Sequence, residues 1–160
     1  MDSITNFFAG LYEWFGLMSL YSKGMMERLR GWDITCTGYI ASPLYVYIGW
    51  IMIILTALIY ILQYHVIDSS RWNKKSHWWL FGLLIFIINF LIAFSVTYNM
   101  VQSGDFCQSD NLTVTDCFGF GFSNALWSLI FFILLTSFPF PRRVIPSRNG
   151  NCRHTTFWKP

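Results

Sequence analysis

The chain has 160 residues and a net charge of +3; 54% of its residues are hydrophobic, 20% are aromatic and only 12% are charged. Soluble domains carry about 25% charged residues, so this composition argues against a water-soluble globular protein. The length allows a single domain over residues 1–160, and the small net charge gives no reason to expect nucleic acid as a partner.

The N-terminal segment, residues 4–21, has the pattern of one amphipathic helix. Glu13 is its only charged residue. Its apolar residues recur every three or four positions, and they are Ile4, Phe7, Phe8, Leu11, Phe15, Met18 and Tyr21. An acid inside a bilayer costs about 2.5–3.5 kcal/mol on insertion scales, so a helix lying in the membrane interface is favoured over a fourth membrane helix.

Three later segments, residues 44–66, 78–101 and 118–140, are long, apolar and free of Asp, Glu, Lys and Arg. About 20 apolar residues in a helix, each rising about 1.5 Å, cross the roughly 30 Å hydrocarbon core of a bilayer. Trp and Tyr flank these segments, as in the aromatic belts of membrane proteins. We therefore predict an all-α, polytopic membrane helical bundle with three transmembrane helices in contact with the lipid bilayer.

The distribution of basic residues predicts how the bundle is oriented. The loop at residues 67–77 and the tail at residues 141–160 are basic, whereas the loop at residues 102–117 has three Asp and no Lys or Arg. The positive-inside rule then places the first loop and the C-terminus in the cytoplasm, for a protein of the cell or inner membrane. The basic residues expected to contact a cytoplasmic partner are Arg71, Lys74, Lys75, Arg142 and Arg143.

The polar connector at residues 23–38 conflicts with this orientation. It carries Lys23, Arg28 and Arg30, yet it falls on the same side of the membrane as the acidic loop. The cytoplasmic side still holds more basic residues, with three in its loop and five in the tail, so the orientation is kept.

Three of the four cysteines fall on the side of the acidic loop. They are Cys36, Cys107 and Cys117, and an oxidising compartment would allow a disulfide among them. We expect Cys107 to be oxidised, and its first-choice partner is Cys117, because the two residues bracket a short loop. Cys36 stays open as a partner for either one, because connectivity cannot be read from a sequence.

Polar residues inside the apolar segments are the candidates for function within the membrane. Asn89 lies at the centre of the second segment, and lipid cannot solvate its amide, so it should face another helix, another subunit or a pore. Ser95 and Thr97 continue the polar content of that segment, and Asn124 adds an amide to the third. Glycines at positions 119 and 121 predict a close backbone approach or a bend where the third helix begins.

No catalytic set, phosphate loop or metal quartet is found in the sequence, so we expect neither an enzyme nor a bound cofactor or metal. The leading hypothesis is a small membrane protein that forms a homo-oligomer or joins a larger membrane complex, with a channel-like assembly as one form. The alternative is a non-conducting anchor or scaffold that recruits a cytoplasmic partner through the basic loop and tail. A channel needs a lumen lined by the polar residues, whereas a scaffold needs them paired within the bundle.

Overall fold

The computed structural model describes residues 3–14, 17–39, 43–63, 75–107 and 111–137. Within these ranges the regular elements are helices joined by turns and loops, and one loop contains an isolated antiparallel bridge between Trp32 and Tyr39. The elements in chain order are α1 (Ser3–Glu13), the 3-10 helix η1 (Leu17–Leu20), α2 (Lys23–Arg30), α3 (Leu44–Ile61), α4 (Lys75–Ser103) and α5 (Val114–Ser137).

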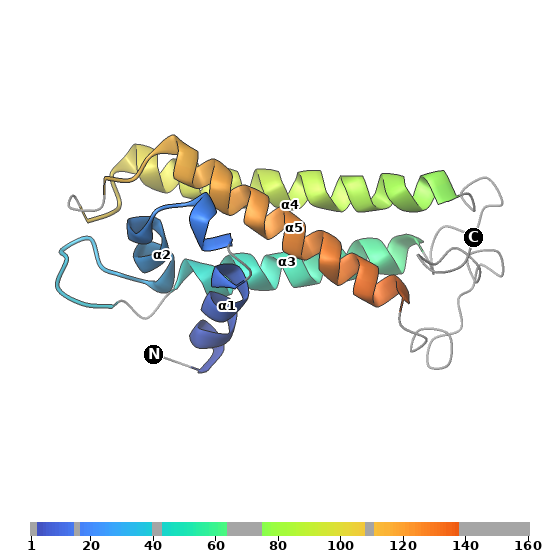
Figure 1. The fold of residues 1–160 in the computed structure, drawn as a ribbon, viewed down its shortest axis with the longest axis horizontal. Coiled ribbons are helices and arrows are strands. Elements are labelled where there is room, and N and C mark those ends of the chain that lie inside the picture. The colour runs from blue at the N-terminus through green and yellow to red at the C-terminus, as the bar shows by residue number, and fades with distance from the viewer. Residues whose placement is uncertain (1–2, 15–16, 40–42, 64–74, 108–110, 138–160) are drawn as a thin grey trace.

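Three of these helices are long and apolar enough to cross a membrane, as predicted. The candidate spans are Leu44–Ile61, His77–Ser103 and Val114–Thr136, with 18, 27 and 23 residues. At about 1.5 Å per residue, even the 18-residue span reaches about 27 Å. The three helices run along the long axis of the molecule, while α1 lies across that axis near the start of α3 (Figure 1).

The helix bounds differ from the predicted segments mainly on the acidic-loop side. Helix α5 begins at Val114 rather than at residue 118, because the Asp116 carboxylate accepts hydrogen bonds from the Thr113 N–H (2.9 Å) and hydroxyl (2.7 Å). Such a contact satisfies a backbone donor at a helix start. The predicted end of the first span at residue 66 and the tail at residues 141–160 lie outside the described residues.

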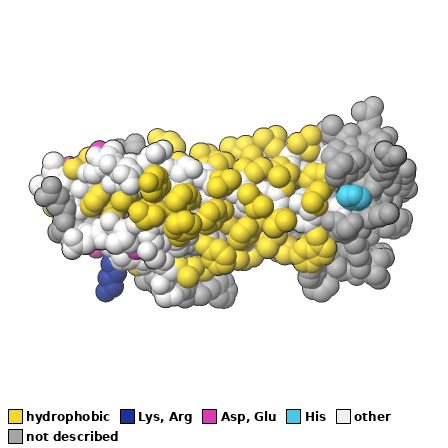
Figure 2. All heavy atoms as spheres, turned by 90° about the horizontal axis from the view of Figure 1, so that it is seen from above, with side chains coloured by type: hydrophobic (Ala, Val, Ile, Leu, Met, Phe, Trp, Pro, Cys, Tyr) yellow, Lys and Arg dark blue, Asp and Glu magenta, His cyan; other side chains and the backbone are white. Residues whose placement is uncertain are grey.

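The middle of the bundle is covered by apolar side chains. Figure 2 shows this as a yellow belt, with the visible Lys, Arg, Asp and Glu side chains at the α2 end. The large apolar residues exposed on the three long helices include Ile54, Leu58, Leu83, Leu84, Ile87, Leu91, Ile130 and Leu134. A soluble monomer rarely exposes such a continuous apolar surface, so these faces are compatible with a small membrane protein.

The prediction of one continuous helix over residues 4–21 is wrong. Helix α1 ends at Glu13, η1 follows, and the chain then turns into α2. The Tyr12 carbonyl, which lies in the last turn of α1, accepts a hydrogen bond from the Tyr21 hydroxyl at 3.2 Å. A tertiary contact thus satisfies one of the carbonyls that a helix end leaves free. With 11 residues, α1 is too short to cross a bilayer.

Helix α2 has clear start and stop signals. The Ser22 hydroxyl accepts a hydrogen bond from the Met25 N–H (3.3 Å), and Gly31 ends the helix in the left-handed conformation with φ at 102°. The Gly31 N–H donates to Arg28 and the Trp32 N–H donates to Glu27, which closes the last turn. These caps fix the direction in which the following loop leaves α2.

Candidate functional site

One end of the molecule carries a compact head on top of the bundle. We define the head as the described residues of 3–39 together with 104–107 and 111–113. It packs on the start of α3, the end of α4 and the start of α5. The head meets the bundle at an apolar cluster in which Tyr12 of α1, Tyr45 of α3 and Phe120 of α5 are fully buried with their rings 5.2–5.8 Å apart.

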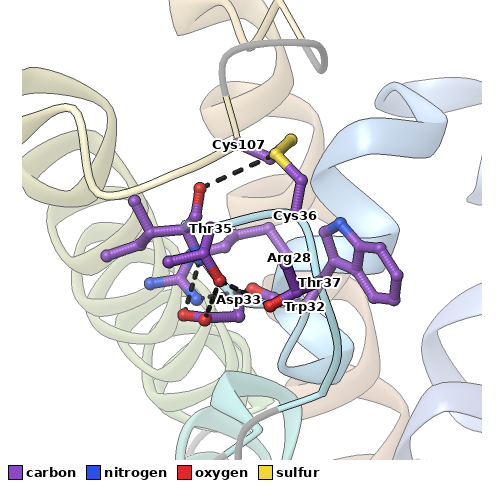
Figure 3. Close-up of a disulfide and its surroundings, with 8 residues drawn as sticks. Arg28, Trp32, Asp33, Thr35, Cys36, Thr37 and Cys107 are labelled. Carbon is purple, nitrogen blue, oxygen red and sulfur yellow. Dashed lines mark hydrogen bonds between the residues drawn. A yellow bond between two sulfur atoms is a disulfide. The ribbon is translucent and has the colours of Figure 1, made fainter.

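A disulfide joins the two loops of the head, but its partners differ from the predicted pair. Cys107 is bonded to Cys36, whose Cα lies 5.5 Å away, and Cys117 is a free, buried thiol. Cys117 belongs to the first turns of α5 and faces the apolar cluster, so the helix holds it away from the loop surface. Cys36 lies on an exposed turn with φ at 59° (Figure 3). The short sequence distance to Cys117 was therefore misleading.

Arg28 links the same two loops beside the disulfide (Figure 3). The side chain is 9% exposed, and its guanidinium donates to the Asp105 carbonyl (2.6 Å) and the Trp32 carbonyl (2.8 Å). Hydrogen bonds from a charged group contribute about 1.5–3 kcal/mol each, whereas leaving the charge buried and unpaired is strongly unfavourable. Arg28 thus holds the two loops of the head together. No sequence pattern around Arg28 predicts this structural role.

An ion pair holds the end of α1 against the end of α2. Arg30 and Glu13 form a two-point salt bridge in which Nε lies 2.9 Å from Oε1. The Glu13 side chain is only 12% exposed. Hydrogen bonding to Glu13 raises the pKa of the Arg30 guanidinium. The single acid of the N-terminal segment is therefore neutralised inside the chain, which lowers the energy needed to hold α1 in an apolar layer.

A buried chain of neutral hydrogen bonds connects α1 to α5 and α4. The Tyr12 hydroxyl donates to Asn124 Oδ1 (2.7 Å), and Asn124 Nδ2 donates to the Asn89 carbonyl (3.0 Å). A second pair joins the Tyr21 and Tyr45 hydroxyls at 3.3 Å. Burial raises the pKa of Tyr12, and burial raises the pKa of Tyr21 to about 12. Both phenols therefore stay neutral at physiological pH and keep the O–H groups that donate these hydrogen bonds. The network thereby holds α1 in place over the bundle.

The four predicted polar residues do not share one face. Asn89 and Thr97 are fully buried, Asn124 is 1% exposed, and Ser95 is exposed on the outer surface of α4. Asn89 Nδ2 donates to the Ile85 carbonyl, and Thr97 donates to its own helix in the same way. Three of the four groups thus lie inside one packed chain and Ser95 points away from them.

The two glycines at the start of α5 allow two close contacts. A Cβ on Gly119 would overlap the Leu20 carbonyl, which belongs to η1, and a Cβ on Gly121 would lie 3.3 Å from the Phe90 ring of α4. Helix α5 can therefore lie against the head on one side and against α4 on the other. Of the two predicted uses of these glycines, a close approach or a bend, the structure shows a close approach, and at Gly119 the partner is the backbone of the N-terminal segment.

Most of the predicted partner-binding residues lie outside the residues that the structure describes. Arg71, Lys74, Arg142 and Arg143 lie outside the described residues, and Lys75 begins α4 at the end opposite the head. Within the ranges that the structure describes, no group of three His, Cys, Asp or Glu side chains could hold a metal ion. No protein-family model, no curated protein and no solved structure matches the chain, so its function is argued from this geometry alone.

Proposed function

We propose that the chain is an integral membrane protein that acts as a non-conducting subunit of a larger membrane complex. In this proposal α3, α4 and α5 anchor the chain, the head lies on the non-cytoplasmic side, and the basic loop and tail bind a cytoplasmic partner. The apolar belt around the three long helices supports the anchoring role. The Cys36–Cys107 disulfide supports a head that folds in an oxidising compartment.

The placement of Asn89, Thr97 and Asn124 carries the choice against a channel. A pore formed between copies of the chain needs polar groups on outward-facing helix surfaces, because only those surfaces meet another copy. These three residues are at most 1% exposed and hydrogen-bonded within their own chain. Among the four predicted residues, Ser95 alone lies on an outer face. The described exposed residues of α4 that precede it are apolar, and the other exposed polar residues of that helix lie near its head end; they are Asn99, Gln102 and Ser103.

Conductance measurements test the non-conducting role directly. We expect the purified full chain, reconstituted into planar bilayers at high protein density, to leave the membrane resistance unchanged. A pore-forming peptide in the same bilayers is the positive control. Reproducible single-channel steps that change amplitude in Ser95→Phe would contradict the proposal, because they would place the outer face of α4 along a pore.

The proposed binding of a cytoplasmic partner is tested by removing the positive charges of the basic loop. Replacing Arg71, Lys74 and Lys75 with Gln removes the predicted contact while leaving the head and the bundle unchanged. Replacing Lys23, which is exposed on the opposite side, is the matched control. We expect the size of the complex isolated in mild detergent to fall in the triple variant only. An unchanged complex in both variants would assign the contact to another surface.

A further inference from the structure

Helix α1 carries an open groove on the side that faces away from the bundle. Its volume is about 450 Å³, and its lining residues are Asn6, Phe7, Gly10, Leu11 and Trp14. Phe7 and Trp14 are 62% and 63% exposed. They flank Gly10 at three and four residues' distance, so all three lie on one helix face, with the glycine as floor and the aromatic rings as walls.

Gly10 has no packing role within the described part of the chain. A Cβ on Gly49 would overlap the Phe8 ring, and a Cβ on Gly119 would overlap the Leu20 carbonyl, whereas a Cβ on Gly10 would meet nothing within 4 Å. A glycine inside a helix is about 1 kcal/mol less favourable than alanine. Gly49 and Gly119 allow internal contacts that offset this cost. Gly10 makes no such contact, and its missing side chain leaves the groove open between the exposed rings of Phe7 and Trp14.

The position of α1 on α3 sets the depth of the groove in a membrane. The Phe8 ring packs on Gly49, five residues after the start of α3 at Leu44, which corresponds to about 7.5 Å along the helix. Helices that lie in a membrane interface bury their apolar face about 5–10 Å into the headgroup and acyl boundary. Helix α1 crosses the bundle axis at this level (Figure 1), as an interfacial helix must.

A chain of ring contacts also links the wall of the groove to the apolar outer surface of α3. Phe7 contacts Phe8 with ring centres 5.3 Å apart, and Phe8 contacts Trp50 at 5.9 Å. Trp50 is 48% exposed on α3, in line with the belt of apolar side chains. The only charge of α1, on Glu13, is paired with Arg30, so the described helix offers no unpaired charge to repel hydrocarbon.

We propose that this groove binds one acyl chain of a membrane phospholipid. An unbranched hydrocarbon chain fits a slot with a glycine floor and aromatic walls, and the groove opens at the depth where such chains begin. Binding would hold α1 flat against the bundle and keep the head at a fixed height above the membrane. This inference rests on the membrane insertion assumed in the proposed function, but it is independent of whether the protein conducts or which partner it binds.

Quenching of Trp14 fluorescence by bromine-labelled lipid tests the inference. The full chain is reconstituted in vesicles of phosphatidylcholine brominated on its acyl chains, and the signal of Trp14 is obtained by subtracting that of Trp14→Phe. We expect the Trp14 signal to be strongly quenched in the wild type. Gly10→Leu, which fills the slot, should lose most of this quenching, whereas Gly10→Ala should retain it because its methyl group meets no neighbour.

Three other outcomes would each overturn the inference. A Trp14 signal that iodide in the buffer quenches and bromolipid does not would show that the groove faces water. A Trp14 signal protected from both quenchers, with a lower molecular mass for Gly10→Leu in mild detergent, would show that a second copy covers the groove. Absence of quenching at every tryptophan, including Trp50, would show that the chain is not inserted, and only this last result also rejects the proposed function.

Discussion

Replacing Gly119 with alanine should force η1 away from α5 and so weaken the packing of the head on the bundle. The new Cβ would overlap the Leu20 carbonyl oxygen and lie 2.6 Å from its carbonyl carbon. Both are backbone atoms, so no side-chain rotation relieves the overlap and η1 must move away from α5. That movement pulls on the hydrogen bond from the Ser22 N–H to the Asp116 carboxylate (2.6 Å) and on the contact between Tyr21 and Phe120 (5.8 Å).

The expected size follows from three terms. Overpacking costs about 1–3 kcal/mol, and weakening a hydrogen bond to a charged group adds up to about 1.5–3 kcal/mol. Alanine is favoured over glycine in a helix by about 1 kcal/mol, which acts in the opposite direction. With that hydrogen bond broken, we therefore expect Gly119→Ala to lower the free energy of unfolding by about 1.5–5 kcal/mol.

Thermal unfolding in mild detergent, followed by intrinsic fluorescence, measures this difference. Gly10→Ala is the matched control, because it makes the same chemical change in a helix where the new methyl group meets no atom within 4 Å. The control should be unchanged or more stable, by up to about 1 kcal/mol. If the two variants shift in the same direction, or if Gly119→Ala matches the wild type, η1 does not lie against α5.

Three further predictions concern the head and the bundle. Peptide mapping without reduction should recover Cys36 linked to Cys107, and any other linkage of Cys107 would contradict the head geometry. Asn124→Leu should destabilise the fold by about 1–3 kcal/mol because it leaves the buried Tyr12 hydroxyl without its acceptor and removes the added bond to the Asn89 carbonyl, whereas Ser95→Ala on the exposed face should be neutral in the same unfolding assay. Hydrogen bonds from a threonine hydroxyl and a backbone N–H lower the pKa of Asp33, so this contribution to stability should be present at neutral pH and lost as the pH falls through that lowered pKa, as an NMR titration of the carboxylate would show.

The three long helices could be predicted because their signal is local and strong. A run of some 20 apolar residues has one stable form in a bilayer, whatever its neighbours are. The sequence also contains a local signal for the start of α5 at Val114, because Thr113 and Asp116 have the spacing of a helix N-terminal cap. The predicted segment began at residue 118 because it was defined by apolar residues alone. Helix ends were therefore misplaced where polar residues extend a helix beyond its apolar part.

The head could not be predicted because its contacts join distant parts of the chain. The break after α1 depends on the hydrogen bond from the Tyr21 hydroxyl to the Tyr12 carbonyl. The disulfide of Cys107 with Cys36 rather than with Cys117 depends on the fold, which exposes Cys36 and buries Cys117. The Tyr12–Asn124 bond spans 112 positions. The sequence left open whether the Asn124 amide lines a pore or contacts a helix, and it did not indicate a partner in the N-terminal segment.

The same tertiary contacts bear on the conflict in the predicted orientation. Three basic residues of the 23–38 segment lie at the head end, against the positive-inside rule. In the fold, Arg30 is neutralised by Glu13 and the Arg28 guanidinium is buried on two backbone carbonyls. Both charges are therefore engaged by groups within the head, although the Arg30 side chain is still 36% exposed, and Lys23 is exposed as well. The disulfide, which favours an oxidising compartment, supports the proposed placement of the head on the non-cytoplasmic side of the membrane.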